Sequence, residues 1–308
     1  MATNANYKSD LKTRYMTAKF TLSEGVYPNS GGNQTLFVPL DSTVGNLYAE
    51  VNLRNEIGLN NNSAIITIFG LENEIINTLS RINLNSNYDL WTDNQVDIYA
   101  GYVLDSASGL PPLVYTGQIR SAGADYSNPE RPFVVQSLQG GVSRNVVSPP
   151  TSISGNISLN DLLKSLANRN GSTYVGNGVT GAVSNIAYDG SLIQQIEKIC
   201  KDYNLVKNWD FTKNILYVAP SGTALSNQVY ELNANAGMIG SPRPLEDGVS
   251  VAAYFNPSLV LGQTVNLTSQ YYDYVNRPWI INAMFHILHN RGQEWLTVMT
   301  LNNFYTTV

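Results

Sequence analysis

Short apolar runs separated by glycine, proline and asparagine are the feature that most restricts the fold of this chain. The run 47–53 places its apolar residues on one face of an extended strand, and the run 64–69 is β-branched and almost wholly apolar. Runs 96–103 and 113–119 flank a segment with glycine and two prolines, which predicts a hairpin. About seven such strands before residue 140, with one helix at 71–79, predict a β-sandwich or a β-barrel.

The middle of the chain has a mixed pattern instead. Ser158 can cap a helix that carries a leucine stripe, and Ser191 can cap a second helix with Gln194 in the capping-box position. A small hairpin around 212–214 follows, and strands return from Gly237 onward. The sequence therefore predicts a mainly β protein with an α+β insertion.

Two or more units are expected, because 308 residues approach the practical limit of a single hydrophobic core, and the pattern of strands and helices divides the chain into three. Residues 10–145 and 237–308 are expected to form two β units, and residues 146–236 a smaller α+β domain between them; the β-barrel form of the two β units is an implication of the family resemblance given below. The last unit can borrow strands from the preceding segments.

Composition excludes several classes of protein. Charged residues make up 13% of the chain and the formal net charge is −5, which excludes a coiled coil and argues against tight nucleic-acid binding. Cys200 is the one cysteine, so no internal disulfide can form, and no run approaches the about 20 apolar residues that span a bilayer. With a polar N-terminal segment, these observations favour folding in a reducing cytosol without membrane insertion.

Motifs that carry chemistry are weak in this sequence. Residues 176–181 match the G-x-G-x-x-G string, but no helix opens directly after them, so a loop is preferred to a nucleotide site. His286 and His289 lie in an expected strand, where their spacing puts them on opposite faces and prevents a shared metal. Cys200 lies on the apolar stripe of its helix, which favours a structural thiol over a nucleophile. We therefore assign no catalytic, cofactor-binding or metal-binding residue.

Two further patterns leave alternatives open. The acidic pairs Asp93 with Asp97 and Asp125 with Glu130 could be imagined as a glycosidase pair, although such pairs arise by chance in a chain with 23 acidic residues. The tyrosine-rich segment 271–274 favours a loop that packs on a neighbour over a sugar-binding platform.

The most specific stretch lies near the end of the chain. It comprises GMIGSP at 237–242, DGVSV at 247–251 and FNPSLVLGQ at 255–263, followed by a terminal hairpin at 279–289 and 293–295. These segments resemble the hub proteins at the centre of baseplates in contractile-tailed bacteriophages, particularly the Mu-like class. Segments 96–102 and 114–119 are similar to a hairpin of the first domain in that family, except that Tyr115 replaces the commoner phenylalanine. The resemblance spans most of residues 45–305.

The resemblance implies a structural virion protein of the tail baseplate that is assembled in the host cytoplasm. It implies two tube-protein-like β-barrel domains per chain and a homotrimer that supplies six similar units around one axis. Such a hub adapts the sixfold tail tube to the threefold spike and lets phage DNA pass through its lumen without sequence-specific binding. The implied partners are tail tube or tube-initiator proteins, the central spike protein and baseplate wedge proteins. No cofactor and no enzymatic activity are implied.

The residues expected to matter form interfaces between subunits and maintain the architecture. They lie in a connector at 237–242, a turn at 256–257 and the terminal hairpin, and they are Gly237, Gly240, Pro242, Gly248, Asn256, Pro257, Trp279 and Trp295. Gly237, Gly240 and Gly248 are expected to permit backbone angles that other residues resist. Pro257 is expected to fix the start of a strand. Two other functions stay open: a β-rich glycan-binding tail adhesin, and a hub with residual cell-wall hydrolase activity.

Overall fold

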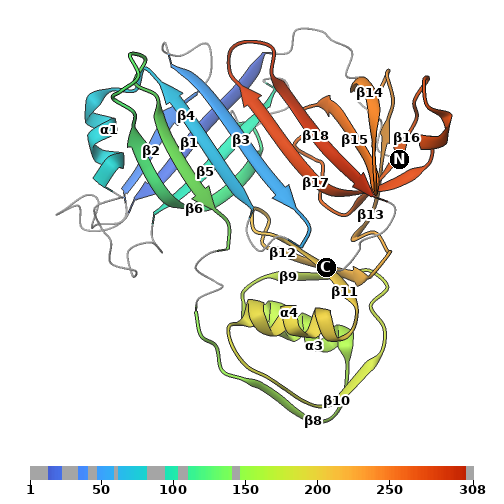
Figure 1. Ribbon diagram of the computed structural model, residues 1–308. Helices are drawn as coiled ribbons and strands as arrows, with labels where there is room; N and C mark the ends of the chain where they lie inside the picture. The colour runs from blue at the N-terminus through green and yellow to red at the C-terminus, as the bar shows by residue number, and fades with distance from the viewer. Residues whose placement is uncertain are drawn as a thin grey trace.

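The computed structural model describes residues 13–22, 34–40, 47–58, 62–81, 94–102, 110–140 and 146–302. Within these ranges the molecule consists of a 13-stranded sheet in two halves and a smaller α+β unit. Figure 1 shows the two halves of the sheet side by side, with the α+β unit at one end of both. The predicted fold class, mainly β with an α+β insertion, is confirmed.

The first half of the sheet is antiparallel and follows the order β3-β4-β7-β6-β5-β1-β2. Its elements are β1 (Arg14–Leu22), β2 (Gln34–Pro39), β3 (Tyr48–Glu56), β4 (Ser63–Phe69), α1 (Asn73–Ser80), β5 (Gln95–Tyr102), β6 (Leu113–Ala124) and β7 (Phe133–Leu138). Buried and exposed side chains alternate along β3 and β4, so the strands curl over a core that includes Phe20, Tyr115 and Phe133. The predicted hairpin is the antiparallel pair β5 and β6.

The second half of the sheet contains the C-terminal strands. They are β14 (Met238–Leu245), β15 (Gly248–Tyr254), β16 (Gln263–Leu267), β17 (Pro278–His289) and β18 (Trp295–Asn302), with the 3₁₀ turn η4 (Asp273–Val275) before β17. This half also takes β13 (Ser226–Leu232), which pairs with β16 in parallel. Antiparallel pairing of β17 with β3, from Ala283 opposite Glu56 to His289 opposite Glu50, joins the two barrel-like halves into one continuous sheet.

The α+β unit contains two amphipathic helices beside short strands. Its elements are β8 (Thr151–Ser158), α3 (Leu159–Arg169), β9 (Thr173–Gly176), β10 (Ala182–Tyr188), α4 (Leu192–Asp202), β11 (Leu205–Asp210) and β12 (Ile215–Pro220). Ser158 Oγ accepts a hydrogen bond from the Asp161 amide at 3.0 Å, and Ser191 forms a complete capping box with Gln194. The structure therefore confirms Ser158 and Ser191 as the residues that cap the starts of the two helices. None of the helices in the described ranges is long and apolar enough to cross a membrane.

We propose to keep the three units as domains, because each has its own hydrophobic cluster. One cluster lies under β1–β7, one between α3, α4 and the strands of the α+β unit, and one under β13–β18. The first cluster also takes Phe255, Leu288 and Trp295 from the second half. The strand β13 lies in the segment 146–236 by sequence but packs with the second half of the sheet.

Candidate functional site

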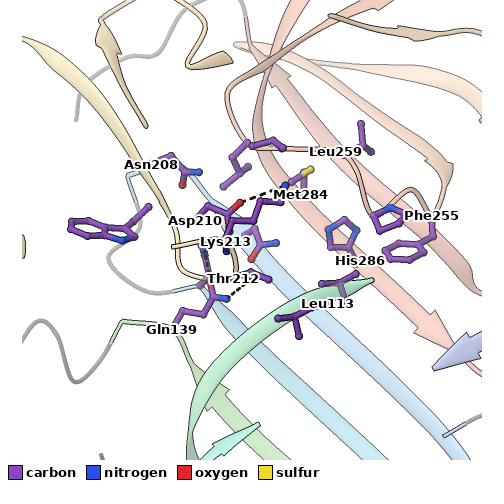
Figure 2. Close-up of a pocket in the computed structure, with 17 residues that line it drawn as sticks. Leu113, Gln139, Asn208, Asp210, Thr212, Lys213, Phe255, Leu259, Met284 and His286 are labelled. Carbon is purple, nitrogen blue, oxygen red and sulfur yellow. Dashed lines mark hydrogen bonds and ion pairs between the residues drawn. The ribbon is translucent and has the colours of Figure 1, made fainter. Parts of the chain in front are cut away.

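The three units meet at a small polar cleft, here named the junction cleft (Figure 2). Its volume is about 60 Å³, and its lining comes from β3, β6, β17, the segment 255–261 and the turn between β11 and β12. The polar lining includes the amides of Asn62, Gln139 and Asn208, the imidazole of His286, and the ion pair of Lys213 with Asp210 at 3.8 Å. The cleft is therefore a joint between units rather than a pocket on one of them.

A chain of side-chain hydrogen bonds crosses this joint. Asn62 Nδ2 donates to Gln139 Oε1 at 3.1 Å, and Gln139 Nε2 donates to Thr212 Oγ1 at 3.3 Å (Figure 2). Next to it, Gly140 has a φ of +74°, and a Cβ atom there would overlap the ring of Phe211. Shape and hydrogen bonding together fix the α+β unit against the end of β7.

His286 lies in the wall of the junction cleft and is 5% exposed. Its Nδ1 is 2.8 Å from Thr297 Oγ1, and its ring meets Phe255 edge-on with the centroids 5.3 Å apart. Burial lowers the pKa of His286 to about 4, so the ring is neutral at neutral pH. His289 lies on the other face of β17, with its Nδ1 3.3 Å from Glu294, so the two histidines diverge as the strand period predicts.

The other groups that could carry chemistry are held in structural roles. Burial raises the pKa of the Cys200 thiol to about 12, in a side chain that is 3% exposed. The glycine-rich segment 176–181 connects β9 to β10, and the Asn177 amide donates to the Val218 carbonyl at 2.8 Å. Among the residues that the structure describes, no group of three or more His, Cys, Asp or Glu residues could hold a metal.

The described aspartates of the two acidic pairs considered from the sequence accept hydrogen bonds from neighbouring side chains. Asp93 lies outside the described residues, and Asp97 accepts hydrogen bonds from Gln95 and Thr116, each at 2.6 Å. Asp125 accepts from the amide and hydroxyl of Ser127 in the turn between β6 and β7, which holds its pKa below the usual value.

The segment 237–242 is not a connector, as we expected from the sequence, but the beginning of β14 at the outer edge of the sheet. Gly237 and Gly240 have φ angles of +92° and +68°, as expected for positions that favour glycine. Gly248 is needed for a different reason, because a Cβ atom there would overlap the Leu301 carbonyl of β18. Pro242 is buried and occupies an edge strand, where the missing amide hydrogen is tolerated.

Asn256 forms the turn that leads away from β15. Its Oδ1 accepts from the Ser258 amide at 3.0 Å and from the Ser258 hydroxyl at 2.6 Å, while Pro257 lines the junction cleft. Trp279 and Trp295 are only 4% and 2% exposed, so both belong to the core of this chain and act on an interface only through the strands they support.

Sequence analysis missed Asn290, which joins the end of β17 to the first half of the sheet. Its Nδ2 donates to the Leu40 carbonyl at 2.7 Å and to the Leu47 carbonyl at 3.1 Å, and its Oδ1 accepts from the Ala49 amide at 3.0 Å. No local pattern marks such a residue, because its partners lie more than 240 residues away in the sequence.

A larger groove lies at the far end of the second half of the sheet. This distal groove has a volume of about 430 Å³ and lies between the β14–β15 turn and the loop 269–277, here named the tyrosine loop. Leu245 and Tyr274 line it and are 43% and 61% exposed, and Glu246 and Asp247 lie on its rim. The exposure of these side chains makes the distal groove a candidate contact surface.

Comparison with protein families identifies the class of this fold. The sequence profile of the family described as Baseplate hub gp41 matches residues 41–301. Among curated proteins, no sequence matches this chain.

Solved structures support the same class at the level of the fold. A tail protein from Neisseria meningitidis MC58 is similar with a TM-score of 0.56 at 10% identity, covering 94% of this chain and 96% of that chain. The 43 kDa tail protein of prophage MuSo2 from Shewanella oneidensis is similar with a TM-score of 0.52 at 9% identity, covering 94% of this chain and 96% of that chain. The E. coli c3393 protein is a type VI secretion component described as structurally similar to the T4 tail proteins gp27 and gp5. It is similar with a TM-score of 0.53 at 9% identity, covering 84% of this chain and 74% of that chain. At this identity the likeness concerns the fold alone.

Proposed function

Because the chain belongs to the Baseplate hub gp41 family, a family of structural phage baseplate proteins, we propose that three copies assemble head to tail into a ring at the centre of the baseplate. The ring adapts a sixfold tail tube to a threefold spike, and phage DNA passes through its lumen. The contacts with tail tube, spike and wedge proteins, and the contractile type of tail, belong to the same proposal.

The pairing of β3 with β17 is the observation that carries the proposal. It sets two barrel-like halves, each with its own core, side by side in one continuous sheet. Two similar units per chain supply six units from three chains, which is what an adaptor between sixfold and threefold symmetry requires.

We assign the lumen to the side of the sheet that faces away from both cores. On β3 this side carries Glu50, Asn52, Arg54 and Glu56, and Arg54 pairs with Glu56 at 2.9 Å. On the described strands β4, β7 and β18 the corresponding residues are uncharged: Ser63, Ile65, Thr67, Phe69, Val134, Gln136, Leu138, Leu296, Val298, Thr300 and Asn302.

On these four strands two carboxylates face one guanidinium, but the same side of β1, β5 and β6 carries Lys19, Asp97 and Arg120, which makes the described charges equal. The hypothesis that the lumen repels DNA phosphates therefore depends on the net charge of −5 of the chain. A strongly positive lumen in the assembled ring would contradict this hypothesis.

The competing functions have less support. Family membership places the chain among structural hubs, and the acidic residue Asp97 is engaged in hydrogen bonds within the sheet rather than exposed in a cleft. A glycan-binding adhesin would use the exposed tyrosines, which a glycan array tests directly.

Solution mass followed by negative-stain imaging tests the proposal. Sedimentation velocity of the purified chain over a concentration series is expected to give a trimer, and images are expected to show a ring with a central channel. A chain that stays monomeric at high concentration with its natural neighbours present would overturn the proposal, as would specific hits on a glycan array or turnover of a cell-wall substrate.

A further inference from the structure

We propose that the junction cleft binds a small cluster of ordered water molecules that links all three units of the chain. The cleft has a volume of about 60 Å³ and lies where the two halves of the sheet meet the α+β unit. Each unit lines it with one polar side-chain group that hydrogen bonds to no residue that the structure describes. The site lies within a single copy of the chain, so the inference does not depend on the proposed ring.

Asn208 is the residue that the α+β unit contributes. It lies on β11, the outer strand of the sheet β11-β12-β9, and it is 9% exposed. Its side-chain amide hydrogen bonds to no described residue. In the part of the chain that the structure describes, the unpaired side-chain atoms that protein seals completely are Gln118 Oε1, Trp209 Nε1 and Trp295 Nε1. The amide atoms of Asn208 are not among them, so they border space that water can reach, and Asn208 lines the junction cleft.

His286 is the residue that the second half of the sheet contributes, through β17. Its Nδ1 is 2.8 Å from Thr297 Oγ1, and its Nε2 hydrogen bonds to no described residue. Burial lowers the pKa of His286 to about 4, so at neutral pH the ring carries one donor nitrogen and one acceptor nitrogen. Water both donates and accepts, so it satisfies Nε2 in either tautomer. Figure 2 shows His286 and Asn208 on opposite sides of the cleft.

Asn55 is the residue that the first half of the sheet contributes. It lies on β3, directly opposite Met284 of β17, and both residues line the cleft. Asn55 is partly buried, and its side-chain amide hydrogen bonds to no residue within the described ranges. The strands β3, β11 and β17 therefore each bring one unsatisfied polar group to the same small space.

Other polar residues of the cleft are already engaged with one another. Asn62, Gln139 and Thr212 form the chain of hydrogen bonds described above, and Lys213 pairs with Asp210 at 3.8 Å. A polar group that leaves bulk water without a new partner carries the cost of its lost hydration. A bridging water molecule restores the missing hydrogen bond at little cost in entropy, which makes water the natural partner of the three remaining groups.

The size and charge of the cleft fit water better than an ion. A volume of about 60 Å³ holds roughly two water molecules at about 30 Å³ each. Lys213 and Asp210 carry opposite charges in the lining and compensate each other, so no net charge attracts a free ion. Leu113, Leu259 and Met284 give the cleft apolar walls, which restrict the positions where water can bond.

The water cluster extends the joint to the second half of the sheet. The direct chain from Asn62 through Gln139 to Thr212 links the first half to the α+β unit, whereas the cluster also reaches β17 through His286. Water-mediated hydrogen bonds are nearly as favourable as direct ones, and they connect groups that are too far apart to bond to each other. The three units are therefore coupled at a place where their side chains do not bond directly.

A crystal structure of the full chain at neutral pH, at a resolution that shows ordered water, tests the site. We expect water density within about 3.2 Å of both the Asn208 amide and His286 Nε2. Asn208→Leu keeps a similar size but removes the amide, and it should abolish that density. Asn168→Leu makes the same change on the exposed side of α3 and should leave the density unchanged. A cleft without water density, or density that is the same in Asn208→Leu, contradicts the site.

A double-mutant cycle in solution tests the link between the units. Asn55→Ala and Asn208→Ala are expected to be non-additive, so that the unfolding equilibrium constant of the double variant differs at least about threefold from the product of the single effects. Asn55→Ala combined with Asn168→Ala is the control pair and should be additive. Additive effects of Asn55→Ala and Asn208→Ala would overturn the water bridge. A chain that never forms a trimer would overturn the proposed ring but would leave this inference unchanged.

Discussion

Replacement of Asn290 by alanine is expected to destabilise the joint between the two halves of the sheet more than most single substitutions would. The side chain is 7% exposed and makes three hydrogen bonds, to the carbonyls of Leu40 and Leu47 and from the amide of Ala49. A buried polar group that loses its partner costs about 1 to 3 kcal/mol. Because water can reach some of the freed groups, we expect a loss of about 3 to 4 kcal/mol in the free energy of unfolding rather than the full sum.

Urea unfolding followed by tryptophan fluorescence measures this loss, since Trp279 and Trp295 are buried in the core. Asn290→Asp is the sharper variant, because a carboxylate keeps the shape but faces two carbonyl oxygens without a proton to donate. Asn168→Ala on the exposed side of α3 serves as the control and is expected to stay within about 0.5 kcal/mol. If Asn290→Ala also stays within that range, the side chain does not hold the halves together and the reasoning fails.

Three further outcomes follow from the structure. Gly140→Ala should cost more stability than Gly171→Ala, by about 1 kcal/mol or more in thermal unfolding, because both glycines have a φ of +74° but only the first Cβ meets Phe211. The pKa of His286 is about 4 in the folded chain and about 6.5 in the unfolded chain. The stability that the neutral ring contributes is therefore complete above pH 6.5, and about 3 kcal/mol of the free energy of unfolding is lost as the pH falls to 4. His286→Gln should flatten that part of the stability profile. Cys200 should resist a thiol reagent at pH 8 until the chain unfolds, and rapid labelling of native protein would contradict its burial.

Local patterns predicted the elements that local chemistry determines. Ser158 and Ser191 begin their helices where the sequence places them, because a cap and its amide partner lie within three residues of each other. The alternation in β3 was equally predictable, since it depends only on the two-residue period of a strand. The run in β4 is almost wholly apolar, so its alternation of burial, with Ile65 46% exposed, is found only in the structure.

Local sequence patterns do not reveal contacts between residues that lie far apart in the sequence. The sequence pattern singled out Gly248 as a glycine with an unusual backbone angle, but the reason for it is the carbonyl of Leu301, which is contributed by another strand. Trp279 and Trp295 are expected at interfaces by residue type, and they are buried because the barrel-like halves close over them. The strand β13 was assigned to the middle unit by position, although its pairing partner β16 lies about 35 residues further along the chain.

Neutral amides supply part of the hydrogen bonding at two joints of the molecule, beside Arg14, which donates to the carbonyls of Gly292 and Gln293 at 2.9 Å and 3.3 Å. Asn290 joins the two halves of the sheet, and Asn62 with Gln139 joins the first half to the α+β unit, in each case through neutral amides. An amide donates and accepts at once, so it can satisfy backbone and side-chain partners without the desolvation cost of a buried charge. Gln139→Leu removes both the oxygen that accepts from Asn62 and the amide that donates to Thr212, so it should loosen the α+β unit without unfolding the sheet. Hydrogen exchange that accelerates in α3 and α4 but not in β3 and β17 would be the signature of that uncoupling, and uniform acceleration would instead mean that the sheet and the α+β unit unfold as one body.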